Sequence, residues 1–154
     1  KYFDELFRVS KNQIIWGGNY FGLPASRCWI IWHKGAGMQG RTYAGAELAW
    51  TSFNQALKKA VIPWSGFIGM EGEKFHPTTK PIKLYAWQLK YFAKPEFKIL
   101  DTHFGSGSIA LAVDKANRLD KMNLHLTACE IDKEYIDKAI KRISESIKQG
   151  TLSF

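Results

Sequence analysis

Short apolar runs alternate with longer amphipathic stretches along the chain, and the two patterns predict strands and helices respectively. Strands are expected where apolar residues run together and glycine, proline or polar residues end the run: 13–16, 27–32, 47–53, 97–101 and 124–130. Helices are expected where apolar residues recur at helical spacing: 2–9, 82–92, 108–119 and 135–148. From residue 97 onward the order is strand, turn, helix, strand and helix, which requires a parallel sheet with a right-handed crossover. The predicted fold class is therefore α/β.

Length and composition narrow the class of protein. The chain has 154 residues, of which 45% are hydrophobic and 23% charged, so one globular domain is expected rather than a disordered chain. No apolar run approaches the roughly 20 residues that span a bilayer, so no membrane partner is expected. Cys28 and Cys129 lie in predicted strands and lack metal-ligand spacing, and the histidines do not cluster. We therefore expect both cysteines in the core, no metal and a reducing, cytoplasmic setting.

The distribution of charge adds a candidate partner. The formal net charge is +8, with 14 basic and 6 acidic residues in 1–100 and 8 of each in 101–154. The positive excess of the first 100 residues favours a polyanion such as nucleic acid; a basic face that only contacts solvent is the alternative. Residues 34–45 contain four glycines and no hydrophobic period, which predicts a mobile loop. Lys34 and Arg41 in this loop are the candidates for contacts with the phosphates of a nucleic acid.

The strongest chemical signal is the turn Asp101-Thr-His-Phe-Gly-Ser-Gly-Ser108, between a predicted strand and a predicted helix. Gly105 and Gly107 permit a tight turn and a close approach of a ligand to the backbone. Asp101 ends its strand and Glu130 ends the next, where ligands of open parallel sheets bind. Because Glu130 can accept hydrogen bonds from ribose hydroxyls, the pattern predicts a site for an adenosine-containing cofactor. The third glycine of a dinucleotide fingerprint is absent, which favours a cofactor without phosphates.

Three segments together resemble a known family. The turn 101–108 resembles the first S-adenosylmethionine motif of the amino-methylating DNA methyltransferases, commonly Asp-Pro-Phe-x-Gly-Ser-Gly. Cys129-Glu-Ile-Asp-Lys-Glu-Tyr135 resembles the next motif of that family, and His76-Pro-Thr-Thr-Lys-Pro81 resembles its His-Pro-Thr-x-Lys-Pro hexamer. The hexamer stands before the glycine turn, an order that resembles the circularly permuted β group. Residues 15–21 and 46–52 are similar to segments of its phage and prophage members.

The resemblance implies a fold, a cofactor and a set of site residues. The implied fold is Rossmann-like, with a mostly parallel sheet and helices on both faces. Residues 1–75 would hold the remainder of the catalytic half and the DNA-facing loops, and 76–154 the cofactor-binding half. The implied cofactor is S-adenosylmethionine, bound by His76, Pro77, Thr78, Lys80, Asp101, Thr102, His103, Phe104, Gly105, Ser106, Gly107, Ser108, Glu130 and Ile131. The implied activity is methylation of an exocyclic amino group of double-stranded DNA, adenine N6 first, in the cytoplasm of a prokaryotic or phage-infected cell.

The chain departs from the family pattern in two places. Thr102-His103 stands where the family has Pro-Phe, which shifts the phenylalanine to Phe104. The catalytic tetrapeptide of the family, Asp-Pro-Pro-Tyr or Ser-Pro-Pro-Tyr, is absent, because the five prolines include no adjacent pair. No catalytic residue is therefore assigned in this chain. The chain begins at Lys1 rather than Met, and the family's motif order leads us to expect the tetrapeptide upstream.

Other functions remain open at this stage. The first alternative is methylation of cytosine N4, which uses the same family motifs. A second is a non-catalytic DNA-binding remnant, and a third is a nucleotide-dependent oxidoreductase with a degenerate glycine fingerprint. The sequence leaves open the recognised DNA sequence, a cognate restriction enzyme and the oligomeric state, a homodimer included.

Overall fold

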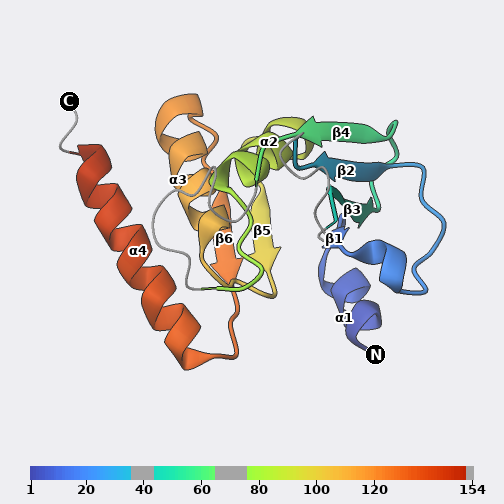
Figure 1. The fold of residues 1–154 in the computed structure, drawn as a ribbon, viewed down its shortest axis with the longest axis horizontal. Coiled ribbons are helices and arrows are strands. Elements are labelled where there is room, and N and C mark those ends of the chain that lie inside the picture. The colour runs from blue at the N-terminus through green and yellow to red at the C-terminus, as the bar shows by residue number, and fades with distance from the viewer. Residues whose placement is uncertain (36–43, 65–75, 152–154) are drawn as a thin grey trace. The chain divides into compact units, whose positions relative to one another are not determined.

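The computed structural model describes residues 1–35, 44–64 and 76–151, with the side chains of 149–151 left aside. The chain forms two compact units, Lys1–Ile68 and Gly69–Phe154 (Figure 1). Within the described ranges, the first unit holds a mixed sheet and one α-helix, and the second holds a pair of strands and three helices. Among the described residues, no helix has the length and apolar character that crossing a membrane requires.

The first unit is built around a four-stranded sheet. Its elements are α1 (Tyr2–Val9), β1 (Ile14–Trp16), the 3-10 helix η1 (Gly18–Tyr20), β2 (Trp29–His33), β3 (Ala46–Thr51) and β4 (Lys58–Val61). The strand order is β1-β3-β2-β4. β3 is antiparallel to both β1 and β2, and only β4 lies parallel to its neighbour β2.

Two expectations are corrected in this unit. The prediction of a mostly parallel sheet is wrong for this unit, because β2 and β3 run antiparallel. The antiparallel pairing continues one step beyond the pair His33 and Ala46, where the Lys34 N–H donates to the Gly45 carbonyl, 2.9 Å away. The strand β4 was not predicted, since its sequence Lys-Lys-Ala-Val has only two apolar residues after two lysines and shows no strand period. The residues expected to form a mobile loop lie mostly outside the described part of the chain.

Alternate side chains of the strands point inward and form the core of this unit. Cys28, Ile30 and Trp32 point to one face and are 0–1% exposed, so the prediction that Cys28 lies in the core is confirmed. Gly18 packs on the opposite face of the sheet, where Trp50 pairs with Trp29: a Cβ at Gly18 would lie 2.4 Å from the Cβ of Trp50. Only a glycine permits so close an approach of the backbone.

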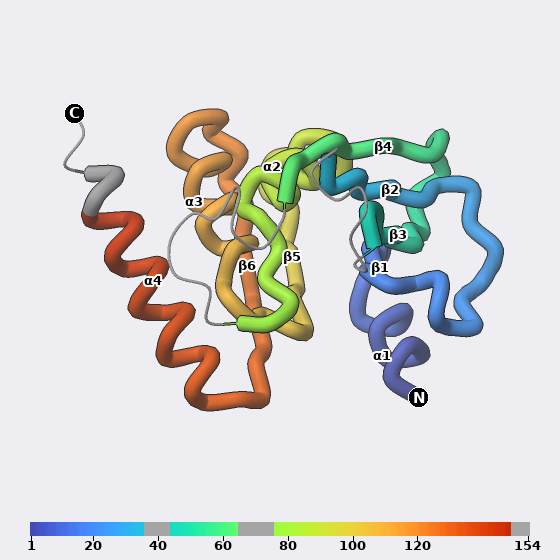
Figure 2. The backbone as a smooth tube through the Cα atoms, viewed as in Figure 1, coloured from blue at the N-terminus to red at the C-terminus, as the bar shows by residue number. Residues whose placement is uncertain are grey.

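The second unit contains the predicted succession of strands and helices. Its elements are α2 (Ile82–Phe92), β5 (Lys98–Asp101), α3 (Ser108–Asp120), β6 (His125–Ala128) and α4 (Lys133–Thr151). The tube in Figure 2 can be followed through them in this order. β5 and β6 are parallel, as predicted, with Asp101 opposite Ala128. The carboxyl ends of both strands therefore lie at the same edge.

Two core predictions fail in the second unit for one reason. Cys129 is exposed and Leu100 is 42% exposed, although both were expected inside buried strands. In β5 and β6 every second residue faces outward, so Lys98 and Leu100 share one face while Ile99 and Asp101 share the other. Cys129 continues the outward series of His125 and Thr127. The inward face packs on Val113, Ala116 and Leu124.

Candidate functional site

The carboxyl ends of β5 and β6 are joined by backbone hydrogen bonds. The Cys129 N–H donates to the Asp101 carbonyl, 2.8 Å away, and the Phe104 N–H donates to the Cys129 carbonyl, 2.9 Å away. These two bonds extend the parallel pairing past the last residue of each strand. They hold the glycine turn, which follows β5, against the residue that precedes Glu130. The sequence signal at 101–108 and the signal at Glu130 thus belong to one site.

Glu130 is held by three backbone N–H groups. The Gly105 N–H donates to Oε2 over 2.8 Å, and the N–H groups of Ile131 and Asp132 donate to Oε1 over 2.9 and 3.1 Å. The bonds from Asp132 and Gly105 are the main reason that the pKa of Glu130 lies below its ordinary value, and the charge of His76 adds to the effect. A carboxylate offers about four acceptor positions. Glu130 therefore keeps its charge and can accept a further hydrogen bond from a ligand hydroxyl.

The glycines of the turn have identifiable neighbours. Both have left-handed backbones, with φ of 53° at Gly105 and 72° at Gly107. A Cβ on Gly105 would lie 3.2 Å from Cε1 and Nε2 of His76, and a Cβ on Gly107 would lie 3.0 Å from Cδ1 of Ile143. The ring of His76 and the side chain of Ile143 in α4 therefore pack directly on the two glycines, and both belong to the same unit as the turn.

His76 connects the hexamer to the glycine turn. Its ring lies 4.5 Å from that of Tyr135, edge to face, and against Gly105. The Thr78 hydroxyl lies 3.3 Å from Nδ1 of His76, and the Thr79 hydroxyl donates to the His76 carbonyl over 2.7 Å. His76 thus brings together two segments that are distant in sequence. Pro77 and Thr78 are exposed, and Lys80 is half-buried.

The two buried serines of the turn are bonded by Arg142, which is half-buried. Ser106 and Ser108 are buried, and their hydroxyl oxygens lie 3.2 Å apart. Arg142 Nη1 donates to the Ser106 carbonyl over 2.9 Å and to the Ser108 hydroxyl over 3.0 Å. These contacts give the two serines a role in holding the turn. Phe104, half-buried, packs beside Gly107.

Tyr135 and Arg142 were not singled out by the sequence pattern. Helical spacing places 135, 139 and 142–143 on one face of α4, which would have been the available signal. Because α4 is rich in lysines and acids, the sequence suggests that Arg142 lies in solvent. Only the contact of Arg142 with the glycine turn assigns it to the site.

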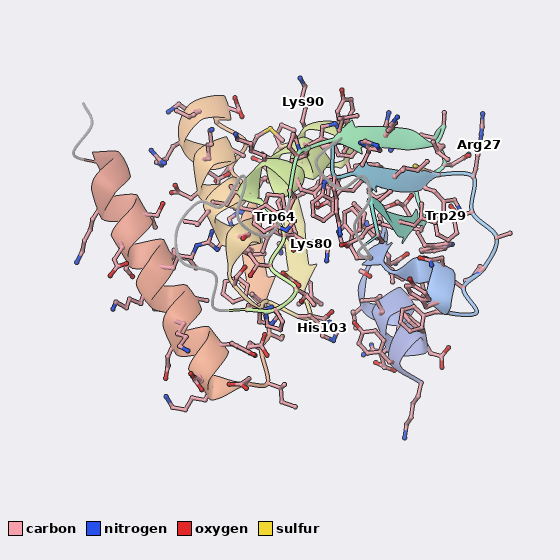
Figure 3. All side chains as sticks on the ribbon, viewed as in Figure 1. Arg27, Trp29, Trp64, Lys80, Lys90 and His103 are labelled. Atoms are coloured by element: carbon pink, nitrogen blue, oxygen red, sulfur yellow. The ribbon has the colours of Figure 1, made fainter. Side chains whose placement is uncertain are left out.

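Asp101 occupies a different electrostatic setting from Glu130. The His103 N–H donates to its Oδ1 over 3.0 Å. Burial at the end of β5 is the main cause that raises the pKa of Asp101, and the charge of Glu130 raises it further, while the hydrogen bond and charge of His103 and the charge of Lys80 lower it. His103 is exposed, with Nδ1 3.0 Å from the Thr102 hydroxyl. Figure 3 draws Lys80 and His103 near β5.

The arrangement suits a molecule with a sugar and a flat apolar ring. Glu130 presents a charged acceptor, and the next side chain, Ile131, is fully exposed at 102%. An exposed isoleucine beside a hydroxyl-binding carboxylate can cover the face of a ring attached to a ribose. Among residues 1–35, 44–64 and 76–151, no cluster of three or more His, Cys, Asp or Glu side chains could hold a metal ion.

The two predicted DNA contacts belong to the first unit. Lys34 Nζ forms an ion pair with Glu47 Oε1 at 2.7 Å, lies 5.2 Å from the ring centroid of Trp32, and its side chain is 12% exposed. A contact between Lys34 and a phosphate would therefore compete with Glu47. Arg41 lies outside the described residues.

Comparison with known proteins identifies the family and the fold. The sequence profile of the N6/N4 DNA methylases matches residues 15–141, a range that includes the hexamer, the glycine turn and Glu130. The structure is similar to the crystal structure of an M1.HpyAVI–SAM complex, with a TM-score of 0.54 and 22% identity over 75% of this chain. The chain spans 60% of the length of that protein. This likeness shows the fold, an α/β Rossmann-like methyltransferase fold, and the profile shows that the chain belongs to the N6/N4 DNA methylase family.

Proposed function

We propose that this chain is part of an S-adenosylmethionine-dependent methyltransferase that methylates an exocyclic amino group of DNA, adenine N6. The observation that carries the proposal is the convergence of three segments at one edge of β5 and β6. Glu130 is oriented by the backbone of the glycine turn, and His76 of the hexamer packs on the same turn. The match to the N6/N4 DNA methylases supports the choice of reaction.

The residues of this edge fit the cofactor by their chemistry. Glu130 would accept a hydrogen bond from a ribose hydroxyl, and Ile131 would cover one face of the adenine ring. His76, Tyr135 and Arg142 would keep the glycine turn in place against α4. When bound, S-adenosylmethionine supplies an electrophilic methyl group on a sulfonium centre. The remaining site residues, Pro77, Thr78, Lys80, Asp101 and Thr102 to Ser108, would line or support the same site.

Calorimetric titration with S-adenosylhomocysteine tests the cofactor assignment. We expect the native chain to bind it and Glu130→Gln to bind about 10-fold more weakly, because a charged acceptor for a ligand hydroxyl is lost. Glu145→Gln is the matched control, since Glu145 is an exposed acid farther along α4. No binding by the native chain, or equal affinity of Glu130→Gln, would contradict the assignment. Thermal protection by NAD but not by S-adenosylhomocysteine would favour an oxidoreductase instead.

Transfer to DNA requires acceptors for the target amino group that this chain does not supply. Enzymes that act on a base take it out of the duplex, and correct positioning of the reacting atoms supplies much of the acceleration. In the family this position belongs to the Asp-Pro-Pro-Tyr or Ser-Pro-Pro-Tyr tetrapeptide, which is absent from this sequence. We therefore expect the 154-residue polypeptide to bind cofactor weakly at best and not to methylate DNA. Measurable methylation by this polypeptide would refute that expectation.

The target base and the subgroup form the finer part of the proposal. The hexamer precedes the glycine turn in this chain, which supports the permuted β group, and residues 15–21 and 46–52 support a phage or prophage member. We propose the cytoplasm of a prokaryotic or phage-infected cell as its compartment because its DNA substrate is there. Mass spectrometry of nucleosides tests the base, on DNA from cells that express this chain joined to a segment that carries the family's catalytic tetrapeptide: N6-methyladenine supports the proposal, and N4-methylcytosine would replace adenine by cytosine.

A further inference from the structure

A cavity in the first unit is separate from the cofactor edge. Its volume is about 370 Å³, and every residue that lines it belongs to the first unit. β1 and β2 begin at this cavity and β3 ends at it, since Gln13, Arg27 and Ser52 are among its lining residues. Ligands of open parallel sheets bind at the carboxyl ends of the strands, whereas this cavity lies at the amino ends of β1 and β2. It is therefore a site that the methyltransferase reaction does not use.

Aromatic rings form the walls of the cavity. Phe7 of α1 and Trp50 of β3 meet edge to face with ring centroids 5.7 Å apart, and Phe53 follows β3. Trp50 is buried, and its Nε1 donates to the Pro24 carbonyl over 2.7 Å. Phe7 and Phe53 are half-buried, so they leave part of their surface to a ligand. Such rings offer stacking surfaces to a nucleobase, because every base has a flat π-face.

The polar groups of the walls are bonded within the protein. Gln13 Nε2 donates to the Ser10 carbonyl over 2.6 Å, and the Gln13 N–H donates to the Ser52 hydroxyl over 2.9 Å. The Ser26 hydroxyl donates to the Thr51 carbonyl. These bonds tie the loops around the cavity to the ends of the strands, so the walls are formed before a ligand binds. A preformed site loses little affinity to the ordering of its own groups.

The polar groups at the mouth of the cavity differ from those of the walls. Arg27 and Asn54 are exposed, and no hydrogen bond or ion pair of either side chain is present among the described residues. Figure 3 shows Arg27 on the segment that leads into β2. Each acid of the first unit pairs with another cation: Asp4 with the amino terminus of Lys1, Glu5 with Arg8, and Glu47 with Lys34. The mouth therefore offers an uncompensated positive charge and an amide.

We propose that this cavity binds a nucleotide, with its base against Phe7 and Phe53 and its phosphate on Arg27. A guanidinium group forms paired, charge-assisted hydrogen bonds with phosphate oxygens, and no carboxylate lines the cavity to repel them. The Asn54 amide carries a donor and an acceptor, the combination that matches the N6 and N7 edge of adenine. A free nucleotide and one nucleotide of a single strand share this chemistry.

Calorimetry with three ligands, in the presence of excess S-adenosylhomocysteine, tests the assignment. Adenosine 5′-monophosphate has the base and the phosphate, adenosine lacks the phosphate, and ribose 5-phosphate lacks the base. We expect the native chain to bind adenosine 5′-monophosphate, and to bind the other two about 10-fold more weakly or less. The S-adenosylhomocysteine keeps adenosine out of the site proposed at Glu130. A chain that does not bind S-adenosylhomocysteine fails the proposed function, but the test of the cavity is unaffected.

Two variants assign the contacts. Arg27→Gln removes the cation and keeps a polar side chain; we expect it to weaken adenosine 5′-monophosphate about 10-fold and to leave adenosine unchanged. Asn54→Leu should weaken both ligands alike, because both carry the base. Lys59→Gln is the matched control, since Lys59 is an exposed cation of β4 outside the cavity, and it should change neither affinity.

The assignment is overturned if the native chain does not bind adenosine 5′-monophosphate or if Arg27→Gln binds it equally well. It is also overturned if Lys59→Gln weakens binding as much as Arg27→Gln, because only the charge of the unit then matters. A short single strand of deoxyadenylate separates the two sources of the nucleotide. Binding about 10-fold tighter than that of adenosine 5′-monophosphate, with a loss in Arg27→Gln, assigns the cavity to a strand. Binding no tighter than that of the mononucleotide assigns it to a free nucleotide.

Discussion

Two carboxylates one strand apart have opposite electrostatic settings. Glu130 accepts three backbone N–H bonds, which lower its pKa, whereas burial raises the pKa of Asp101. A lowered pKa means that the ionised group contributes stability above its unfolded pKa, and that this stability is lost as the pH falls through the folded value. A raised pKa has the reverse effect: the ionised form of Asp101 destabilises the ligand-free protein. A destabilising charge at the edge where strands end is typical of a group kept for binding.

Asp101→Asn should therefore stabilise the protein while it removes cofactor binding. Near neutral pH the variant lacks the half-buried charge but keeps an oxygen that can accept the His103 N–H. We expect its melting temperature to exceed that of the native chain by roughly 1–4 °C. The difference should shrink as the pH falls through the folded pKa of Asp101 toward its ordinary value of 3.8, because the native carboxyl becomes neutral as well.

Thermal melts across this pH range, with calorimetry on the same samples, provide the measurement. A variant that melts below the native chain near neutral pH would show that the charge of Asp101 supports the fold. Retention of S-adenosylhomocysteine binding would show that the cofactor does not need the charge of Asp101.

At the scale of elements, α4 acts as the support of the glycine turn. Ala139 is fully buried, Ile143 lies against Gly107, and Arg142 bonds both the Ser106 carbonyl and the Ser108 hydroxyl. The rest of the helix's apolar stripe is less covered, with Ile140 54% and Ile147 40% exposed. The middle of α4 therefore packs against the glycine turn more closely than the exposed residues of the same stripe pack against anything else described. We infer that the geometry of the turn depends on this helix.

Arg142→Met tests this dependence. The variant keeps a long apolar side chain but leaves the Ser106 carbonyl and the Ser108 hydroxyl without their charged donor, which should cost about 1–3 kcal/mol of unfolding free energy. We also expect weaker S-adenosylhomocysteine binding, because Gly105 of the same turn orients Glu130. The control is Lys141→Met, the exposed neighbour, which should alter neither quantity. Equal stability and affinity of Arg142→Met and the native chain would refute the role of α4.

At the scale of the whole molecule, charge is divided unevenly between the two units. The first unit, Lys1–Ile68, has 8 basic and 3 acidic residues, and the second, Gly69–Phe154, has 14 and 11. The first unit is therefore net +5 on fewer residues, against +3 for the second. Such an imbalance favours the first unit for the proposed contact with the DNA backbone.

The proposed DNA contact predicts a strong dependence on salt. Fluorescence anisotropy with a labelled duplex should show affinity falling roughly 10- to 100-fold between about 50 and 200 mM salt, because counterions are released from the phosphates. Glu47→Gln should tighten binding a few-fold by releasing Lys34, and Lys34→Gln should weaken it. Glu145→Gln makes the same change of charge in the second unit and serves as the control. If the Lys34 and Glu47 variants bind DNA as tightly as the native chain does, Lys34 does not contact DNA.

The sequence by itself determined the order of every described helix and strand except β4 and η1, and it predicted which residues meet at the carboxyl ends of β5 and β6. Periodicity was sufficient for α1, α2, α3, β5 and β6 to within a few residues, since each has a regular apolar pattern and clear breaks. The glycine turn, the hexamer and Glu130 were found because turns that bind ligands need particular residues at particular spacings.

Only the tertiary structure decided what these residues touch. It paired Lys34 with Glu47, turned Cys129 outward and made β3 antiparallel to its neighbours. It also brought Tyr135 to His76 and Arg142 to the glycine turn. The physical reason is the range of the interactions. Turn chemistry and periodicity depend on neighbours within a few residues, and they are written in the local sequence. Strand register, side-chain parity and contacts such as Arg142 with Ser106 depend on segments distant in sequence, which meet only when the chain packs.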